Sequence, residues 1–374
     1  MRRIIAAVVY VPLLLSPSLG QDAAPRGITD PVVLAPFNQS AAQCEAPKDL
    51  SRSLVFFQDN DREFMEGVSA GLQAAAADRD LSYSVALAAD DANKMIEGVL
   101  AAVKDKSGAM VAAPVNATTL ADPLRQAIAS GAYVGTVVPP PATTILNAPQ
   151  YLTGERLAQA AAQYITTELD GRANVVLLTH DSLEFLAPRF TAMRDVLSKL
   201  PNVTIVADLS PTPVNVEGGY TAMQLILLAD PKIDVVLGAD TVVLGALKAL
   251  REAEKARPDQ FLGGIDGEPE AIAELRDPNS PYKVSVSLAS PVFGYALGYY
   301  AADWLDGKSV PQAMDILPTL LDAENIDAYR ADLADPSAVF ADQARRAQYL
   351  RMYGNICFDT KTQFLDFPWS SENR

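Results

Sequence analysis

The chain has 374 residues, 49% of them hydrophobic and 20% charged, which suits two globular domains of ordinary composition. Thirty basic residues against 46 acidic ones give a net charge of -16 at pH 7, so the chain should repel nucleic acid and anionic lipid. With one histidine and two cysteines, a multi-histidine metal site is excluded and histidine-based catalysis is disfavoured, so we expect no metal and no cofactor.

The amino terminus has the layout of a secretory signal peptide. Arg2 and Arg3 precede an apolar run from Ile4 to Leu15, and small residues follow up to Gly20. Residues 1–20 are therefore expected to be cleaved on export, leaving a periplasmic protein that does not insert into the membrane. The apolar run is shorter than a bilayer-spanning helix, and an uncleaved membrane anchor is the alternative interpretation.

The two cysteines, Cys44 and Cys357, lie near opposite ends of the chain. In an exported protein an even cysteine count favours a disulfide, because the compartment is oxidising. Such a bond would fasten both terminal extensions, residues 21–50 and 326–374, to the core. A redox or metal-binding pair is the alternative, but such sites normally have closely spaced cysteines.

The first half of the chain alternates short β-rich apolar runs with helical periodicity, a pattern typical of βαβ units and a parallel sheet. The predicted strands cover residues 53–58, 83–88, 108–113 and 133–138. The predicted helices cover residues 64–77, about 95–103 and about 120–130. Prolines cannot continue a helix or a central strand, so the proline-rich residues 139–149 are expected to be a linker or a crossing.

The same alternation restarts after Gly154 and predicts a second α/β domain. The predicted strands cover residues 174–178, 203–207, 234–238, 261–265, 284–288 and 316–321. The predicted helices cover residues 154–169, 189–200, 220–228, 242–256, 269–275 and 292–305. Near the carboxyl terminus we expect one helix over residues 339–352, followed by an irregular tail whose aromatic residues cover the core or dock a partner.

Open parallel sheets bind ligands beyond the carboxyl ends of their strands, so polar residues there are candidates for a site. The sequence places these at such ends: Asp59, Asn60, Asp61, Arg62, Asp90, Asp91, Asn116, His180, Asp181, Asn215, Asp240 and Asp266. An Asp or Asn before a helix is equally suited to be an N-cap, above all at Asp61 and Asp240. Asp266 is the preferred ligand contact, because a carboxylate in its tight turn can accept two hydroxyl hydrogen bonds. His180 would face a cleft or pack at its strand end.

The sequence contains few of the motifs expected of a nucleotide-binding protein or of an exported enzyme. The sequence has no Gly-x-x-x-x-Gly-Lys and no Gly-x-Gly-x-x-Gly after the first strand, so nucleotide binding is disfavoured. An exported α/β enzyme would need an acid/base pair in its cleft, and the single histidine counts against it. Binding without catalysis is therefore the favoured interpretation.

Two runs in the second domain carry a family resemblance. Residues 240–250 read DTVVLGALKAL and residues 264–270 read GIDGEPE. They resemble the patterns Asn-Asp-x-x-Ala-Leu-Gly-Ala-Leu and Gly-x-Asp-Gly-x-Pro of type I periplasmic binding proteins, in the ribose-binding subgroup. The first half is similar more loosely, through residues 64–68, Pro114 and residues 316–319. The resemblance covers roughly residues 51–330.

The resemblance implies a fold of two doubly wound parallel-sheet domains joined by a three-segment hinge. We place the amino-terminal lobe at residues 51–144 and 290–315, and the carboxyl-terminal lobe at residues 145–289 and 316–325. It also implies that the lobes close on a small carbohydrate-like ligand, which a monomeric protein delivers to an ABC transporter permease. A sensing module for a chemoreceptor or a sensor kinase is the alternative, because both roles use the same hinge closure.

By position, the resemblance and the strand ends together suggest a set of ligand contacts. The expected ligand-binding residues are Asp266, Phe64, Arg62, Asn116, His180, Asp240 and Ile265. The family's positions also map to Met65, Ala113, Val138, Pro139, Ala239 and Ala289. Ala239 stands where the family has an asparagine, and Val138-Pro139 stands where it has Asp-Arg. The ligand is therefore not expected to be ribose.

Overall fold

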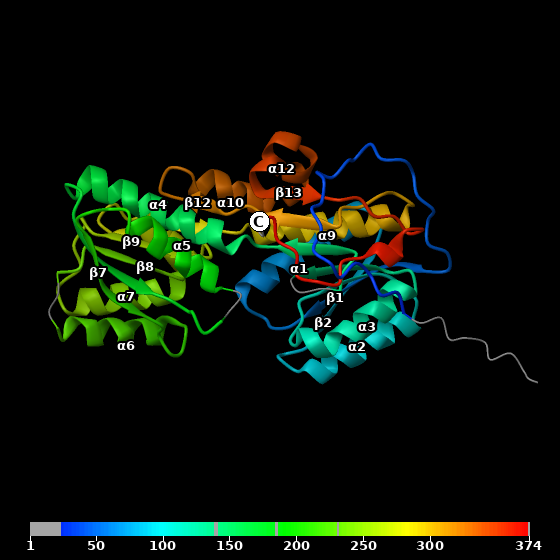
Figure 1. Cartoon of the computed structure of the whole chain (residues 1–374), viewed down its shortest axis with the longest axis horizontal. Coiled ribbons are helices and arrows are strands. Elements are labelled where there is room, and N and C mark those ends of the chain that lie inside the picture. The colour runs from blue at the N-terminus through cyan, green and yellow to red at the C-terminus, as the bar shows by residue number, and fades with distance from the viewer. Residues whose placement is uncertain (1–23, 138–140, 184–185, 230–231, 373–374) are drawn as a thin grey trace, which may run out of the picture.

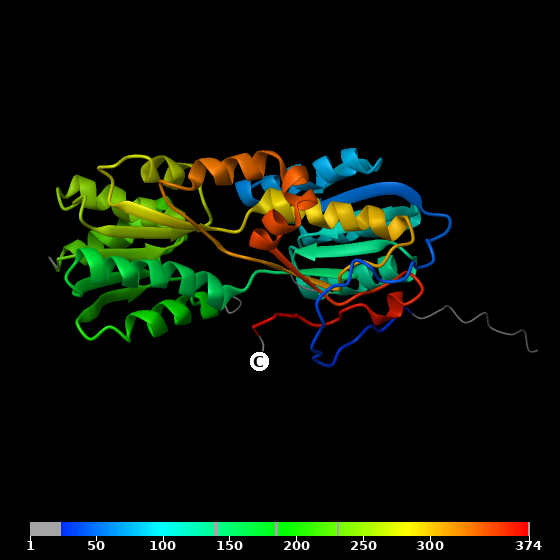
Figure 2. The same cartoon turned by 90° about the horizontal axis from the view of Figure 1, so that it is seen from above.

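The computed structural model describes residues 24–137, 141–183, 186–229 and 232–372, and the predicted signal peptide lies outside this part of the chain. The described residues form two α/β lobes that lie side by side (Figures 1 and 2). Each lobe is built around one mostly parallel sheet, which confirms the expected fold class. None of the helices in the described residues combines the length and apolarity needed to cross a membrane.

The first lobe, here called the N-lobe, carries a seven-stranded sheet in the order β13-β11-β5-β4-β3-β1-β2. Its elements are β1 (Ser51–Gln58), α1 (Glu63–Asp78), β2 (Ser82–Leu87), α2 (Ala92–Lys104), β3 (Ser107–Ala112), α3 (Ala117–Ala129), β4 (Tyr133–Val137), β5 (Thr144–Asn147), α9 (Ser290–Leu305), β11 (Ala313–Ile316) and β13 (Leu350–Tyr353). Helices α1 and α9 pack together on one face of the sheet, and α2 and α3 cover the other.

The second lobe, here called the C-lobe, carries a six-stranded sheet in the order β12-β10-β9-β8-β6-β7. Its elements are α4 (Gln150–Glu168), β6 (Ala173–Leu178), α5 (Ala187–Leu197), β7 (Val203–Leu209), α6 (Val216–Leu227), β8 (Val235–Gly238), α7 (Asp240–Glu252), β9 (Phe261–Ile265), α8 (Pro269–Leu275), β10 (Tyr282–Ser287) and β12 (Thr319–Leu321). The first five strands of each lobe therefore follow the same doubly wound order.

Alternating side chains on the central strands explain why each sheet is covered on both faces. In β6, Val175 and Leu177 pack against α4 and α5, whereas Val176 and Leu178 belong to the core that includes α6 and α7. Successive side chains of a strand point to opposite faces, so a continuous apolar run requires helices on both sides. The uninterrupted run of residues 175–178 is thus sufficient to specify a central strand.

The chain passes between the lobes three times. We call Ala148–Pro149 the first crossing, Leu288–Ala289 the second and Leu317–Pro318 the third, because each joins an element of one lobe to an element of the other. Strands β5 and β10 run into the first two crossings at their carboxyl ends. Since the central strands of each sheet are parallel to β5 or β10, the carboxyl ends of both sheets are directed toward the crossings.

Two expectations about the crossings are wrong. Residues 144–147, expected within a linker, form β5 between β4 and β11, and all four of these residues are buried. The strand expected over residues 316–321 is two strands, β11 in the N-lobe sheet and β12 in the C-lobe sheet, separated at the third crossing. Pro318 has no N–H to donate to a ladder, which suits the break. The expected boundaries after residues 144 and 315 therefore fall inside strands of the N-lobe.

The carboxyl-terminal part of the chain differs from the single helix expected over residues 339–352. It contains α10 (Ile326–Ala334), α11 (Pro336–Ala341), α12 (Gln343–Tyr349), the strand β13 and a short 3-10 helix, η1 (Lys361–Gln363). The helix breaks at Asp342, whose extended backbone lets its carboxylate cap α12. Strand β13 pairs with β11, so this segment is part of the N-lobe sheet.

The expected disulfide is present between Cys44 and Cys357, whose Cα atoms are 5.6 Å apart. It joins the amino-terminal segment to the carboxyl-terminal segment across 313 positions of sequence. Aromatic residues of the tail cover the core: Phe364 is fully buried, and Trp369 packs against Tyr353 with ring centroids 5.0 Å apart. The disulfide and these aromatic contacts thus fasten both terminal segments to the N-lobe.

Candidate functional site

The candidate site lies at the carboxyl ends of the two sheets, which face the crossings. In both lobes the strand order reverses beside the first strand, between β1 and β3 and between β6 and β8. In open α/β sheets such a reversal leaves a crevice in which ligands bind. The polar residues predicted from the strand ends therefore come together at two opposed edges.

Asp266 marks the edge of the C-lobe. Ile265 ends β9 and is fully buried, and Asp266 follows with a φ of 119°, a left-handed value that glycine favours. Protein atoms crowd the carboxylate although the residue is exposed, and the loss of water raises the pKa of Asp266 to about 6. Arg189 lowers this pKa and Asp240 raises it. A strained, partly dehydrated carboxylate is suited to accept hydrogen bonds from a ligand.

Asp240 contacts the turn that carries Asp266. It is fully buried, and its carboxylate accepts hydrogen bonds from Tyr282 Oη at 2.6 Å, from Ser285 Oγ at 2.8 Å and from the N–H groups of Gly267 at 2.8 Å and Glu268 at 2.9 Å. Burial raises the pKa of Asp240, and these hydrogen bonds oppose the shift. The contacts fix the turn that carries Asp266, so Asp240 acts here by positioning the turn.

The glycine at position 264 is required for a steric reason. A Cβ on Gly264 would stand 1.8 Å from Asp240 Oδ1 and 2.2 Å from Tyr282 Oη. Only a residue without a side chain lets the carboxylate approach the strand so closely. Residues 263–267 therefore form the turn that carries Asp266 and also leave room for the Asp240 carboxylate that holds this turn.

Arg189 is a site residue that the sequence analysis missed. It lies in the first turn of α5, is 6% exposed, and donates through Nε to Gln150 Oε1 at 2.9 Å. Within the described residues its two Nη atoms have no hydrogen-bond partner, and burial lowers the pKa of Arg189 while Asp266 raises it. A buried guanidinium with free donors beside a carboxylate is a ready site for polar ligand atoms. The sequence signal was weak, because one arginine on an amphipathic helix usually faces solvent.

His180 follows β6 and is half-buried at the same edge. Its neighbour Asp181 is not free for a ligand, because Arg194 donates to it at 2.5 Å and also pairs with Asp208 at 2.6 Å. The hydrogen bond from Arg194 lowers the pKa of Asp181, and burial opposes this shift. Of the two expected polar residues after β6, His180 is thus the better candidate for a ligand contact.

The N-lobe edge carries Arg62 and Phe64. Arg62 is the exposed N-cap position of α1, and its Nε donates to Asn60 Oδ1 at 3.0 Å. Phe64 packs against Phe293 of α9 with ring centroids 5.6 Å apart and remains partly accessible. This edge therefore presents a cation and an aromatic ring, both held by neighbours within the N-lobe.

Asn116 occupies the N-cap of α3. Its Oδ1 accepts a hydrogen bond from Thr119 N at 3.0 Å, and the residue is exposed. Asp91 and Asn215 cap α2 and α6 in the same manner. The capping alternative is therefore realised at these three positions, although the free amide nitrogen of Asn116 still faces solvent.

The remaining positions suggested by the family resemblance carry little polar chemistry. Ala113 and Ala239 directly follow strands β3 and β8 and have no side-chain donors, and Ala289 lies at the second crossing with a φ of 45°. Val138 and Pro139 lie outside the described residues. Polar recognition at this site thus depends on few side chains.

Two further patterns have structural explanations. Residues 67–71 read GVSAG, which matches the Gly-x-Ser-x-Gly pattern of hydrolases, but they lie within α1 rather than at a strand-to-helix turn, and Ser69 Oγ is 2.9 Å from Tyr83 Oη. Among the described residues, the grouping with metal-ligand spacing is Cys44, Cys357 and Asp359, and its two sulfurs are joined to each other.

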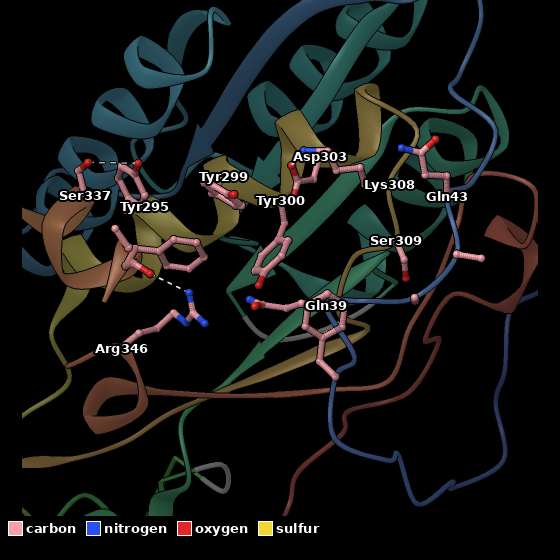
Figure 3. Close-up of a pocket in the computed structure, with 15 residues that line it drawn as sticks. Gln39, Gln43, Tyr295, Tyr299, Tyr300, Asp303, Lys308, Ser309, Ser337 and Arg346 are labelled. Atoms are coloured by element: carbon pink, nitrogen blue, oxygen red, sulfur yellow. Dashed lines mark hydrogen bonds and ion pairs between the residues drawn. The ribbon is translucent and has the colours of Figure 1, made fainter. Parts of the chain in front are cut away.

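A separate hollow of about 530 Å³ lies on the outer side of the N-lobe (Figure 3). Its walls come from residues 37–43, from α9 and from α11 and α12, with Tyr299, Tyr300 and Phe340 forming an aromatic cluster. Arg346 lies over Phe340 and donates to its backbone oxygen at 2.7 Å. This hollow is made by the two terminal segments and does not include any of the expected ligand contacts.

Comparisons with known proteins agree with this architecture. The family model of the periplasmic binding protein domain matches residues 54–309. The fold is similar to a periplasmic ribose ABC transporter protein of Conexibacter woesei, with 20% identity, a TM-score of 0.65, and coverage of 75% of this chain and 95% of that chain. It is also similar to an ABC transporter solute binding protein of Bacillus halodurans with bound myo-inositol, with 19% identity, a TM-score of 0.64, and coverage of 76% and 99%.

A third similar structure is a periplasmic solute binding protein of Actinobacillus succinogenes with bound D-allose, with 18% identity, a TM-score of 0.64, and coverage of 74% of this chain and 99% of that chain. At these identities the likeness concerns the two-lobed fold. The family model spans most of both lobes and includes the first two crossings. The chain belongs to the periplasmic binding protein domain family.

Proposed function

We propose that this protein is the solute-binding component of an ABC importer and captures a small carbohydrate-like ligand between its lobes by hinge closure. The observation that carries the proposal is buried Arg189, whose two Nη atoms have no hydrogen-bond partner within the described residues and whose charge lowers the pKa of Asp266 at the edge of the C-lobe. Three crossings beside this edge allow the opposite lobe to close over it.

The chemistry of the two edges fits a polyhydroxylated ligand. A hydroxyl group can donate to the Asp266 carboxylate and accept from the Arg189 guanidinium at the same time. Phe64, on the N-lobe edge, offers a flat apolar surface for the C–H face of a sugar ring. Arg62, Asn116 and His180 are further polar groups that closure would bring toward the ligand, and Ile265 and Asp240 support the turn.

The ligand class is narrowed by the similar structures and by the departures from the family pattern. Proteins of the same fold are described with ribose, myo-inositol and D-allose. Here Ala239 and Val138-Pro139 replace polar residues of the ribose-type pattern, and a ligand hydroxyl left unpaired in a closed site costs about 1–3 kcal/mol. We therefore propose a sugar, polyol or derivative other than ribose.

The proposal includes where the protein acts and with what. We propose that residues 1–20 direct export and are removed, that the mature protein is a periplasmic monomer, and that the loaded form docks on a transporter permease. We propose that the ligand is released unchanged, as expected of the periplasmic binding protein domain family.

The test is a ligand screen on the mature protein, unfolded to remove any carried-over ligand and refolded. Thermal unfolding is recorded against sugars, polyols and sugar acids, and hits are titrated by calorimetry. A ligand at 100 times its dissociation constant adds about 2.7 kcal/mol, so the shift in Tm will be evident. Arg189→Met should abolish the shift, while Arg156→Met, an exposed change on α4, should retain it.

The screen also has outcomes that overturn the proposal. The absence of a shift with every carbohydrate would show that the fold has been kept for another ligand class. Recovery of a chemically altered compound would show that the protein is an enzyme. A shift that survives Arg189→Met unchanged would remove the C-lobe pair from the binding site.

A further inference from the structure

The carboxyl-terminal extension, expected over residues 326–374, follows β12 directly in the structure, so the name C-terminal extension is used below for the described residues 322–372. It begins at the C-lobe, continues through α10 at the hinge, and then pairs β13 with the N-lobe sheet (Figures 1 and 2). It contacts the second and third crossings and the start of α4 beside the first crossing.

Tyr329 of α10 contacts the second crossing. Its hydroxyl is 2.5 Å from Ser287 Oγ, at the end of β10, and accepts a hydrogen bond from Ala289 N at 3.1 Å. Tyr329 is 4% exposed, and Asp327 in the same helix forms an ion pair with Arg276 of the C-lobe. Helix α10 is thus attached to the C-lobe and to the backbone of the crossing at once.

Tyr349, at the end of α12, contacts the third crossing. Its backbone oxygen accepts a hydrogen bond from Leu317 N at 2.8 Å. Its hydroxyl donates to Asp332 of α10 at 2.6 Å, and its ring lies 6.2 Å from that of Tyr329. The contacts at the second and third crossings are therefore linked through two neighbouring aromatic side chains.

Glu372, near the end of the chain, contacts the start of the C-lobe beside the first crossing. Its carboxylate accepts hydrogen bonds from Leu152 N at 2.7 Å and from Tyr151 N at 3.3 Å, in the first turn of α4. That helix begins after Pro149, has no side-chain cap of its own and no acidic residue in its first turn. An anion at a helix amino terminus satisfies free N–H groups and the helix dipole, so Glu372 supplies the missing cap.

The segment just before Glu372 is anchored on the other lobe. Asp366 pairs with Arg125 of α3 at 2.8 Å, and Leu365 bonds to Ala142. The disulfide to Cys44 fastens the same region further upstream. Six residues after the anchor at Asp366, Glu372 reaches the C-lobe, so the chain end forms a non-covalent connection between the lobes.

This connection also leads to the candidate site. The residue preceding Tyr151 and Leu152 is Gln150, whose Oε1 accepts the hydrogen bond from Arg189 Nε at 2.9 Å. The cap that Glu372 provides therefore holds the turn of α4 that orients the buried guanidinium. The contacts of Glu372 and Tyr329 are with α4 and the second crossing, so any effect of these residues on the site passes through other residues.

We propose that the C-terminal extension is a hinge strap: through Tyr329, Tyr349 and Glu372 it restrains all three crossings, and Glu372 positions Arg189 for the ligand. The effect on ligand affinity rests on the proposed function, whereas the restraint of the lobes does not. Loosening the strap widens the range of lobe orientations in the free protein, and closing on a ligand must then order a larger ensemble.

The first test needs no ligand. Cysteines at two exposed positions, Thr118→Cys in the N-lobe and Glu217→Cys in the C-lobe, carry spin labels, because the native cysteines are joined to each other. Pulsed distance measurements on the free protein compare the unmodified strap with Glu372→Ala and with Tyr329→Phe, which keeps the ring and removes the hydroxyl. Both variants should broaden the distance distribution. The matched control, Glu324→Ala, removes an exposed acidic side chain of the extension away from the crossings and should leave it unchanged.

The second test uses a sugar found by the screen. Glu372→Ala should weaken its affinity by about threefold or more and, because the cap of α4 is lost, should also lower the unfolding midpoint, whereas Glu372→Gln, which keeps an acceptor oxygen, should recover part of both losses. Unchanged distance distributions and affinities in both Glu372→Ala and Tyr329→Phe would overturn the strap. Broadened distributions in a protein that binds no sugar would keep the strap and reject the proposed ligand class.

Discussion

The two lobes share a strand order but differ in how they hold their side of the site. At the C-lobe edge, hydrogen bonds join side chains far apart in sequence: Asp240 with Tyr282, 42 positions away, and Arg189 with Gln150, 39 positions away. At the N-lobe edge the bonds are local, as between Arg62 and Asn60. The C-lobe half is therefore fixed by tertiary contacts, and the N-lobe half by turns and caps.

This difference suggests a division of labour during binding. Groups locked by buried hydrogen bonds lose little freedom when a ligand arrives, so the C-lobe edge is suited to bind first. The N-lobe edge, with its exposed Arg62 and partly accessible Phe64, can adjust as the lobes close.

The largest effect is expected from Asp240→Ala. The change removes the acceptor of the buried Tyr282 hydroxyl and of the Glu268 N–H, while Gly267 N–H keeps Ser285 Oγ, so the free energy of unfolding should fall by about 3 kcal/mol. Asp240→Asn keeps one acceptor oxygen and should lose less. Urea unfolding measures both, and an unchanged midpoint for Asp240→Ala would show that the C-lobe edge is not fixed by this carboxylate.

Arg189→Met should separate binding from stability. The change removes free donors from the site but keeps apolar volume, so affinity for a sugar should fall at least tenfold, which corresponds to about 1.4 kcal/mol. The Tm of the free protein should stay the same or rise, because a buried cation without full pairing is lost. Calorimetric titration gives the first quantity and thermal unfolding the second. A lower Tm with unchanged affinity would make Arg189 purely structural.

The pH dependence should report Asp266. Its folded pKa of about 6 lies above the ordinary 3.8, so the folded state binds more protons between these values, and the free protein should lose stability as pH rises from about 4 through about 6. Sugar hydroxyls donate to the ionised form, so affinity should fall when pH is lowered from 8 to 5.

Two variants test whether Asp266 is the residue responsible for this pH dependence. Asp266→Asn should remove it, whereas His180→Gln, a change after β6 at the same edge, should retain it because the Asp266 carboxyl is still present. Arg189 and Asp240 are the charged groups that face Asp266, and neither is altered in these variants. If His180→Gln abolishes the pH dependence instead, the titrating group lies after β6 rather than after β9.

The smallest effect is expected on the N-lobe edge. Asn116→Ala removes the cap of α3 and should cost about 1 kcal/mol of unfolding free energy, while Asn116→Asp keeps the cap oxygen and should cost much less. Sugar affinity of the Asp variant shows whether the amide also contacts ligand. A loss of affinity there would mean that the N-lobe edge contributes specific recognition and would weaken the contrast between the lobes.

The strands and helices with a strong hydrophobic pattern could be predicted from the sequence. A strand buried on both faces must be a continuous apolar run, and such runs are easy to recognise. Residues 175–178 and 261–265 show this, and their ends placed Asp266 correctly after β9. Strand β5 could not be found, because four residues between prolines carry too little pattern; the neighbouring strands β4 and β11 make them a strand. The division between β11 and β12 likewise depends on which sheet each half joins.

The α/β class, the two domains, the candidate edge with Asp266 and the pairing of the two cysteines could all be inferred from the sequence, because periodicity, turn residues and the number of cysteines can be read from it directly. The roles of Asp240, Arg189 and Glu372 became apparent from the three-dimensional contacts. Their partners lie 42, 39 and 220 positions away, and a buried carboxylate, a buried cation and a helix cap acquire their meaning from those partners. Such contacts arise when elements far apart in the sequence pack together. Local sequence patterns do not predict them.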